Sequence, residues 1–420
     1  MSLDDSPGIL PSQWIRGALD AGILCTAEPV KPTQIQPNSL DLRLGTRGWR
    51  VGHSLLPGRE TVCDKLERYK WFDAPLDEGG RVLEPNQVYV FQLAEALNLP
   101  PSVAATFNPK SSTGRLDVFS RVVGDYGEQF DSVPEGYTGP LFVEIVPRSF
   151  GIRVRPGDSL VQARFVRGDP QLEAHEVADL IENHSVVMRP ESSPQSCGIS
   201  SERGLLLSVR VRGESNETIG FRPRKNQPPI DLQAVGKLPL SMYWERIVYR
   251  PDEPLILTPD EFYILASSET ICLPPSVCAE MVPFEAPRGE VRTHYAGFFD
   301  SGFGYHPQLP ATQTGSAVVL EVRTRDVPFM LDDAQFLFRI LLLRNSEPPD
   351  ILYGTQLDSN YQGQRLRLGK QFCADPDNWA SPGGTNGETN YRVPGGDYAR
   401  PHRNDPPSGD IGNSDIPRVT

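Results

Sequence analysis

Paired cysteines are absent from this sequence of 420 residues. Its six cysteines form no C-x-x-C motif: Cys25, Cys63, Cys197, Cys272, Cys278 and Cys373. This pattern indicates neither a disulfide framework nor a structural zinc site, and it fits a reducing compartment. The six histidines show no metal-ligand spacing either. We therefore expect no metal site built by the protein and a cytoplasmic location.

An excess of positive charge and long apolar runs are also missing. The formal net charge is -13, which argues against a nucleic-acid partner because such proteins carry a basic face. No stretch approaches the roughly 18 apolar residues of a membrane span, and the N-terminus has no basic region followed by an apolar one. The sequence predicts neither a membrane nor a nucleic-acid partner.

Turn-forming residues are plentiful, with 41 prolines and 37 glycines. Between them lie short apolar runs rich in β-branched and aromatic residues, which predict strands over 39–44, 87–93, 140–146 and 159–166. Helical periodicity is confined to LPSQWIRGALDAGIL (10–24), where Ser12 can cap the helix, and to the stretch after residue 170. The fold class is therefore mainly β with a few short helices.

An internal duplication is visible in the chain. LEPNQVYVFQLAEALNLPPSVAA (83–105) aligns without gaps with LTPDEFYILASSETICLPPSVCA (257–279), with 10 of 23 positions identical. The alignment continues so that Glu144 matches Glu321. We expect one domain over residues 1–199, a second over 200–372, and a disordered tail rich in Pro, Gly, Asn and Asp over 373–420.

One loop suits a polyphosphate. NPKSSTGRL (108–116) places Lys110, two hydroxyls, a glycine and Arg115 within six residues. Hydroxyl and backbone N–H groups can donate to phosphate oxygens while the cations supply charge. An ordinary surface turn has the same composition.

A second candidate is Glu144, which lies inside the apolar run PLFVEIV (140–146). A carboxylate there is costly to bury unless it is paired or protonated, so it suits general acid or base chemistry. The alternative is a glutamate on the solvent face of an edge strand.

The order of these motifs resembles that of the dCTP deaminase family and its dUTPase relatives. The shared features are K-S-S-x-x-R, then G-Y-x-G-x-L-x-x-E, then R-P-G-D-x-L-x-Q. QIQPNSLDLRLG (34–45) and residues 10–24 are similar to the family's first strand motif and opening helix. Because the resemblance continues to residue 372, the chain is similar to the two-copy form of the family.

The resemblance implies residue roles in dCTP deamination. Glu144 would take a proton from water, allow hydroxide to attack C4 of cytosine, and pass the proton to the departing amino group. Ser111 would orient the water, and Arg115 would hold Glu144 and the base. The implied binding residues are Lys110, Ser112 and Gly114 in the loop, with Phe142 and Val143 beside the base.

The end of the second copy, LYGTQLDSNYQGQRLRL (352–368), resembles the family's closing lid. Its implied contacts to the triphosphate come from Tyr353, Tyr361 and Gln364, while Asn360 stands where the family has lysine. Opposite KSSTGR the second copy reads FEAPRGEVR (284–292), without a serine pair. We therefore expect Glu321 to be structural and one composite site per chain, with the lid acting on its own or a neighbouring chain.

The resemblance also implies fold, product and assembly. It implies tandem dUTPase-like distorted β-barrels, related to a jelly roll (β-clip), in a homo-oligomer, with the trimer of single-domain members as one option. The activity would be zinc-free hydrolysis of dCTP to dUTP and ammonia, feeding dUMP and thymidylate synthesis. Mg²⁺ would arrive bound to the substrate triphosphate.

Rival functions stay open at this point. A zinc cytidine-type deaminase is excluded because H-x-E and P-C-x-x-C are missing. dUTPase activity is disfavoured, since Pro134 stands at the position of the aspartate in the family's turn. A bifunctional enzyme releasing dUMP remains an alternative, as does a non-enzymatic protein that binds nucleotides.

Overall fold

Strands dominate the computed structural model, which describes residues 6–188, 199–200, 204–282, 291–293, 297–308, 315–324, 326–354 and 361–373. The mainly β prediction is confirmed. Three segments with sequence predictions lie outside the described residues: the predicted tail beyond Cys373, Asn360, and most of the 284–292 stretch. In the described parts of the chain, no helix has the length and apolar character needed to cross a membrane.

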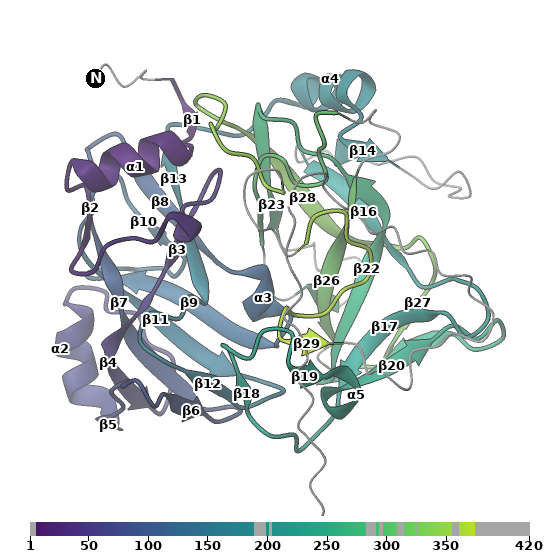
Figure 1. Cartoon of the computed structure of the whole chain (residues 1–420), viewed down its shortest axis with the longest axis horizontal. Coiled ribbons are helices and arrows are strands. Elements are labelled where there is room, and N and C mark those ends of the chain that lie inside the picture. The colour runs from purple at the N-terminus through teal and green to yellow at the C-terminus, as the bar shows by residue number, and fades with distance from the viewer. Residues whose placement is uncertain are drawn as a thin grey trace, which may run out of the picture. The chain divides into compact units, whose positions relative to one another are not determined.

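The first half, residues 6–169, contains two main sheets (Figure 1). One has the order β1-β13-β8-β10 with β3 beside β13, and the other has the order β5-β4-β7-β11-β9 with β2 beside β7. The strands of this half that belong to these sheets, and β6 and β12 beside them, are β1 (Gly8–Ile9), β2 (Leu24–Thr26), β3 (Leu40–Leu42), β4 (Leu44–Val51), β5 (Lys70–Asp73), β6 (Arg81–Leu83), β7 (Val88–Asn98), β8 (Ala104–Pro109), β9 (Val118–Gly124), β10 (Ser132–Val133), β11 (Thr138–Pro147), β12 (Ile152–Val154) and β13 (Val161–Arg167).

The second half, residues 170–373, is built around one large sheet with the path β20-β17-β22-β16-β28-β23-β25, on which β26 pairs with β22. The strands of the second half, in this large sheet and in smaller ones, are β14 (Val187–Met188), β15 (Ile199–Ser200), β16 (Gly204–Arg210), β17 (Thr218–Pro223), β18 (Ile230–Asp231), β19 (Leu238–Pro239), β20 (Trp244–Val248), β21 (Leu255–Leu257), β22 (Phe262–Ile271), β23 (Val277–Val282), β24 (Val291–Thr293), β25 (Phe298–Phe299), β26 (Ser316–Thr324), β27 (Phe329–Leu331), β28 (Phe336–Arg344) and β29 (Phe372–Cys373).

The helices are short and lie at the margins of the sheets, apart from α3, which Figure 1 shows at the boundary between the halves. They are α1 (Ser12–Asp20), η1 (Pro32–Gln34), α2 (Val62–Tyr69), α3 (Ser111–Gly114), α4 (Ala174–His184) and α5 (Leu240–Tyr243). The predicted cap of α1 is wrong. Pro11 is the N-cap, and the Ser12 hydroxyl instead donates to Asp350 of the second half.

The two halves share strand register as well as sequence. In the first, Glu144 on β11 lies opposite Val90 on β7, and in the second Glu321 on β26 lies opposite Ile264 on β22. Val90 and Ile264 are also partners in the sequence alignment of the two halves. The two glutamates therefore occupy equivalent ladder positions.

The halves are joined through one core. β18 of the second half extends the first half's β6-β12 sheet, pairing in parallel with β12. The largest apolar cluster continues across the boundary, since Trp244, Phe262 and Val319 pack with the first-half barrel residues. Residues up to Cys373 thus form a single compact unit, which fixes the faces that meet at the boundary.

Candidate active site

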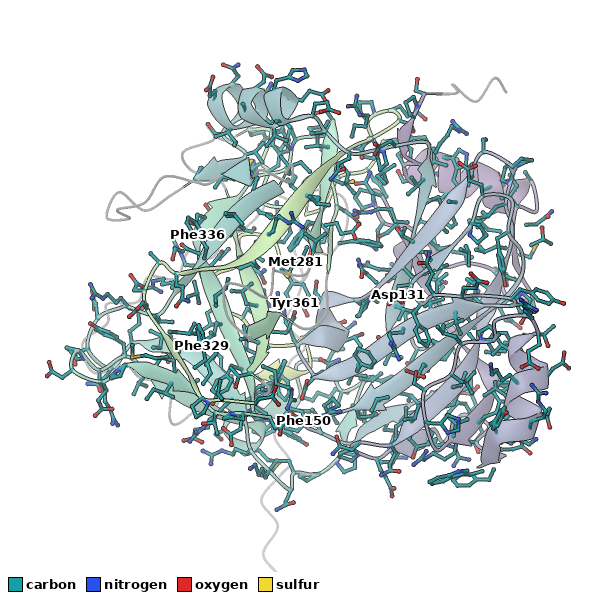
Figure 2. All side chains as sticks on the ribbon, turned by 180° about the vertical axis from the view of Figure 1, so that it is seen from behind. Asp131, Phe150, Met281, Phe329, Phe336 and Tyr361 are labelled. Atoms are coloured by element: carbon teal, nitrogen blue, oxygen red, sulfur yellow. The ribbon has the colours of Figure 1, made fainter. Side chains whose placement is uncertain are left out.

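A cavity of about 520 Å³ opens between the halves, a size suited to a small ligand. Its lining from the first half is Thr33, Gln36, Asp41, Pro109, Lys110, Ser111, Ser112, Gly114, Arg115 and Gln162. Its lining from the second half is Met281, Gly297, Phe298, Phe299, Asp300, Phe303, Val319, Glu321, Tyr353, Tyr361, Gln364 and Lys370. Figure 2 shows Met281 and Tyr361 at the inner edge of the second half.

The K-S-S-T-G-R loop forms one side of this cavity. β8 ends at Pro109, and Ser111 to Gly114 make the single turn α3 with Lys110 as its N-cap. The turn is fastened to the chain near residue 160, because the Lys110 N–H and the Thr113 hydroxyl both donate to the Leu160 carbonyl, at 2.9 and 2.8 Å. These hydrogen bonds hold the loop against the segment that leads into β13.

Arg115 connects this loop to the lid residues Tyr353, Tyr361 and Gln364. Its guanidinium donates to the Gln364 side-chain oxygen at 2.9 Å and to the Arg367 carbonyl at 2.9 Å. It also lies 3.8 Å from the centroid of the Tyr361 ring, within the range of a cation–π contact. The Gln364 amide donates in turn to the Ala317 carbonyl at 3.0 Å. Loop and lid thus meet within one chain.

Glu321 is one of three carboxylic acids that line the cavity, with Asp41 and Asp300. It lies on β26, its side chain lines the cavity together with Val319, and it is only 5% exposed. Burial raises the pKa of Glu321 from an ordinary 4.5 to about 8, although the nearby charge of Arg115 lowers it in part. A carboxyl group that titrates near neutrality suits general acid–base chemistry, because it can both accept and donate a proton there.

Glu144 does not line this cavity. It accepts a bond of 2.8 Å from Arg121, which also donates to Ser54 and lies 3.7 Å from the Phe130 ring centroid. The same face of β11 packs on α2 through Phe142, within a cluster that includes Val62 and Leu66. The chain's own α2 segment and Arg121 therefore cover the face on which Glu144 lies.

The structure divides the predicted site residues into two groups. The structure brings eight of the predicted residues to the cavity: Lys110, Ser111, Ser112, Gly114, Arg115, Tyr353, Tyr361 and Gln364. It leaves out Glu144, Phe142 and Val143, which face α2 or the first-half core. Their sequence equivalents are Glu321, Val319 and Leu320, and the first two line the cavity. The expectation that Glu321 is merely structural is not supported by this placement.

An aromatic wall and a buried acid complete the second half's side, and of these residues the sequence reasoning identified only Tyr353. Phe303 lies between Phe299 and Tyr353, with ring centroids 5.2 and 5.7 Å apart. Asp300 accepts bonds from the first half's Arg164 at 2.9 Å and from Ser39 at 3.1 Å, and burial raises its pKa. Rings beside a held carboxylate suit a flat base carrying a polar sugar.

A mainly β fold with one polar cavity between its halves, lined by a hydroxyl-rich cationic loop and a buried acid, defines an enzyme with a site for a nucleotide-like anion. In comparison with known proteins, both halves match the models of one family. Residues 6–169 match the N-terminal domain of 2'-deoxycytidine 5'-triphosphate deaminase (DCD), and residues 173–372 match its C-terminal domain. The chain belongs to the dCTP deaminase family.

Relatives agree with this assignment. The crystal structure of 2'-deoxycytidine 5'-triphosphate deaminase from Agrobacterium tumefaciens is 42% identical, with a TM-score of 0.75, covering 82% of this chain and 100% of that one. A dUMP-forming dCTP deaminase of Methanoculleus marisnigri is 31% identical over 34% of this chain and 72% of its own length. The dCTP deaminase of Ignicoccus hospitalis is 27% identical over 38% and 84%. The predicted tandem dUTPase-like fold is confirmed.

Proposed function

We propose that this protein hydrolyses dCTP to dUTP and ammonia in the cavity between its halves, and that Glu321, rather than Glu144, is the acid–base residue. The observation that carries this is the meeting of Glu321 with Ser111 and Arg115 in one cavity. Family membership supports the choice of substrate. The dUTP formed would feed dUMP and thymidylate synthesis.

The chemistry needs one water and one group that shuttles a proton. The Glu321 carboxylate takes a proton from water as the water oxygen bonds to C4 of cytosine, and Ser111 orients that water. The protonated Glu321 then returns the proton to the amino nitrogen, and the C4–N bond breaks to release ammonia. Arg115, held by Gln364 and Tyr361, keeps its charge beside Glu321 and favours the carboxylate form.

The triphosphate would be held by the loop and the lid residues. Lys110, Ser112 and Gly114 contribute from the first half, and Tyr353, Tyr361 and Gln364 from the second. Mg²⁺ would be carried by the triphosphate as part of the substrate. Among the residues that the structure describes, no group of three or more His, Cys, Asp or Glu side chains could hold a metal ion.

Two other functions are separated by product analysis. A bifunctional enzyme would give dUMP, a reaction that several relatives carry in their names, including that of Methanoculleus marisnigri. A nucleotide-binding protein without activity would give no product. The protein should be incubated with dCTP, and separately with dUTP, in the presence of Mg²⁺. We expect dCTP to yield dUTP and ammonia, and dUTP to remain unchanged. Production of dUMP and pyrophosphate, or of nothing, would contradict our proposal.

We also propose that the chain arose by duplication, with domains over 1–199 and 200–372. The shared register of Glu144 and Glu321 supports the duplication, as do the separate matches of residues 6–169 and 173–372 to family models, while the boundary at 199–200 stays a prediction. Cytoplasmic location and assembly into a homo-oligomer stay predictions. Analytical ultracentrifugation across a concentration series would test the assembly.

A further inference from the structure

Three charged residues from separate parts of the chain line the cavity together: Asp41 on β3, Lys110 before α3, and Lys370 shortly after the lid residues. The Lys110 ammonium forms an ion pair with one Asp41 oxygen. The other Asp41 oxygen is buried and has no hydrogen-bond partner among the described residues. Asp41 is thus only partly compensated.

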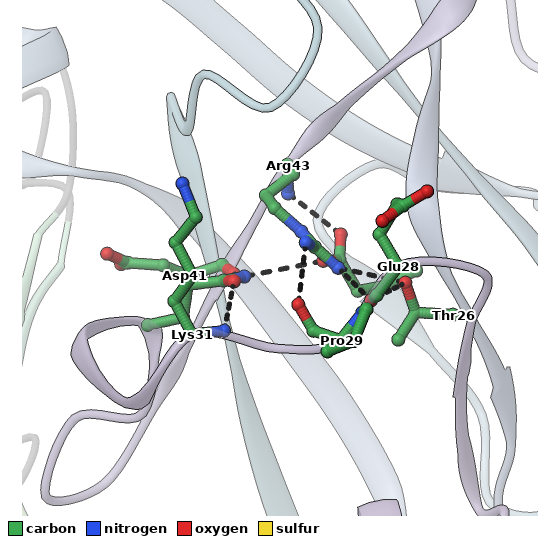
Figure 3. A network of polar contacts seen from close by, with 8 residues as sticks. Thr26, Glu28, Pro29, Lys31, Asp41 and Arg43 are labelled. Atoms are coloured by element: carbon green, nitrogen blue, oxygen red, sulfur yellow. Dashed lines mark hydrogen bonds and ion pairs between the residues drawn. The ribbon is translucent and has the colours of Figure 1, made fainter.

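The position of Asp41 is fixed by a network of polar contacts around its backbone (Figure 3). The Gln34 amide donates to the Asp41 carbonyl at 2.9 Å and to a Glu95 oxygen at 3.4 Å. Glu95 in turn forms a buried ion pair of 2.7 Å with Arg43, two residues along from Asp41. Because the strand is held in this way, the Asp41 carboxylate stays at the cavity.

Lys370 is half-buried, and its backbone is held because its carbonyl accepts a bond of 2.9 Å from the Gly236 N–H. Among the described residues, no carboxylate forms an ion pair with its ammonium group. Burial lowers the pKa of Lys370 and the neighbouring charge of Lys110 lowers it further, while the charges of Asp41 and Asp158 oppose this in part. Asp41 and Asp158 are the carboxylates near Lys370, and Asp41 is already paired with Lys110. Since neither carboxylate forms an ion pair with Lys370 among the described residues, an anion in the cavity can take that place.

We propose that Lys370 is a further binding residue for the triphosphate beside Lys110, and that Asp41 is the internal counterion that holds Lys110 until the substrate arrives. The inference rests on the proposed function and deepens it. An ammonium group is a compact cation that forms strong, charge-assisted bonds to phosphate oxygens. When the triphosphate binds, its oxygens replace Asp41 as the partner of Lys110 and provide Lys370 with its partner.

Inorganic tripolyphosphate is a suitable probe because it binds without a base and is not deaminated. In calorimetric titrations, Lys370→Gln should weaken its binding by about tenfold, as expected for one lost charge-assisted contact. Lys370→Arg should retain most of the affinity. Lys237→Gln is the matched control, because Lys237 is exposed, lies outside the cavity lining and carries the same charge. Equal affinity of Lys370→Gln and the wild type, or no binding by the wild type, would overturn the proposal.

The counterion has its own test. Asp41→Asn should tighten tripolyphosphate binding severalfold, because Lys110 no longer has to leave a carboxylate. Unchanged or weaker binding by this folded variant would contradict that role.

Turnover of dCTP separates this inference from the function on which it rests. Lys370→Gln should raise KM for dCTP with little change in kcat, the pattern of lost ground-state binding. A wild type that deaminates dCTP while Lys370→Gln keeps its KM refutes the role of Lys370 alone. A wild type that leaves dCTP unchanged refutes the proposed function, whatever the tripolyphosphate titrations show.

Discussion

Arg115 and Gln364 are joined by a hydrogen bond of 2.9 Å, although 249 positions separate them in the chain. The bond connects the K-S-S-T-G-R loop of the first half with the lid residues near the C-terminal end of the second half. Since Glu321 lines the same cavity, all groups assigned to the reaction lie within a single chain. This arrangement determines which substitutions should abolish activity and which should be tolerated.

The two equivalent glutamates should respond differently to the same substitution. Glu321→Gln should lower kcat by about 10³-fold, within the range for loss of a general acid–base group. Glu144→Gln should stay within about threefold of the wild type, because its partner is Arg121 and not the cavity. Steady-state kinetics with dCTP measures both. An inactive Glu144→Gln with a native unfolding temperature would return the catalytic role to Glu144.

A mixing experiment should show that the site forms within one chain. Ser111→Ala and Glu321→Gln chains, unfolded together and refolded as a mixture, should have only the sum of their residual activities. If loop and acid came from different chains, random assembly would restore about a quarter of the sites. Recovery near that level would contradict a site within one chain. Refolded wild type serves as the control for yield.

The raised pKa of Glu321 predicts a pH dependence of activity. A general base acts in its carboxylate form, so kcat/KM should rise with pH and level off above about 8. A rate profile from pH 5 to 10 tests this. A profile that is already level from pH 5 to 6 upward would show that the free protein does not hold Glu321 protonated.

The same shift affects stability. The folded chain keeps the Glu321 proton from about pH 4.5 to about 8, where the unfolded chain has lost it, so rising pH should weaken folding across that window. Glu321→Gln cannot ionise, and its stability relative to the wild type should grow by roughly 4–5 kcal/mol from pH 4 to pH 9, at 1.36 kcal/mol per pKa unit. Denaturant titrations measure this, and a constant difference would contradict the burial of a titrating acid.

The buried pair of Arg164 and Asp300 should contribute strongly to the union of the halves. Arg164→Met leaves the Asp300 carboxylate buried without its partner, so unfolding should cost roughly 3–5 kcal/mol less. Arg222→Met is the matched control, because its pair with Glu245 is about four-tenths exposed and should cost under about 1 kcal/mol. Similar losses for both variants in urea titrations would contradict this contrast.

Much of the fold could be predicted because it depends on local patterns. The run at 140–146 became β11, and the runs at 87–93 and 159–166 became β7 and β13. The cap of α1 could not be predicted, because the hydroxyl of Ser12 bonds to Asp350, more than 300 residues away. A local rule cannot anticipate such a partner.

The candidate site could likewise be predicted only where its residues follow one another in the sequence. The loop 110–115 was found because its hydroxyls and cations are contiguous in the sequence. Choosing between Glu144 and Glu321 requires knowing which face of each sheet lies against the other half. Arg121 and α2 cover the face that carries Glu144, and the sequence does not show this contact. The signal for Glu321 was already present in its alignment with Glu144. Asp300 and Lys370 had no such signal, since their neighbours come from the opposite half.

The covering of Glu144 by α2, and the opening of Glu321 to the first half's loop, change how the site comes into being. In a protein whose active site lies between separate subunits, dilution dissolves the site along with the complex. In this protein the loop of the first half and Glu321 of the second half come together when the chain folds. How readily they meet depends on the effective concentration of two segments in one polypeptide. Specific activity should therefore be independent of protein concentration, and the stability of the chain alone should limit how long the site persists.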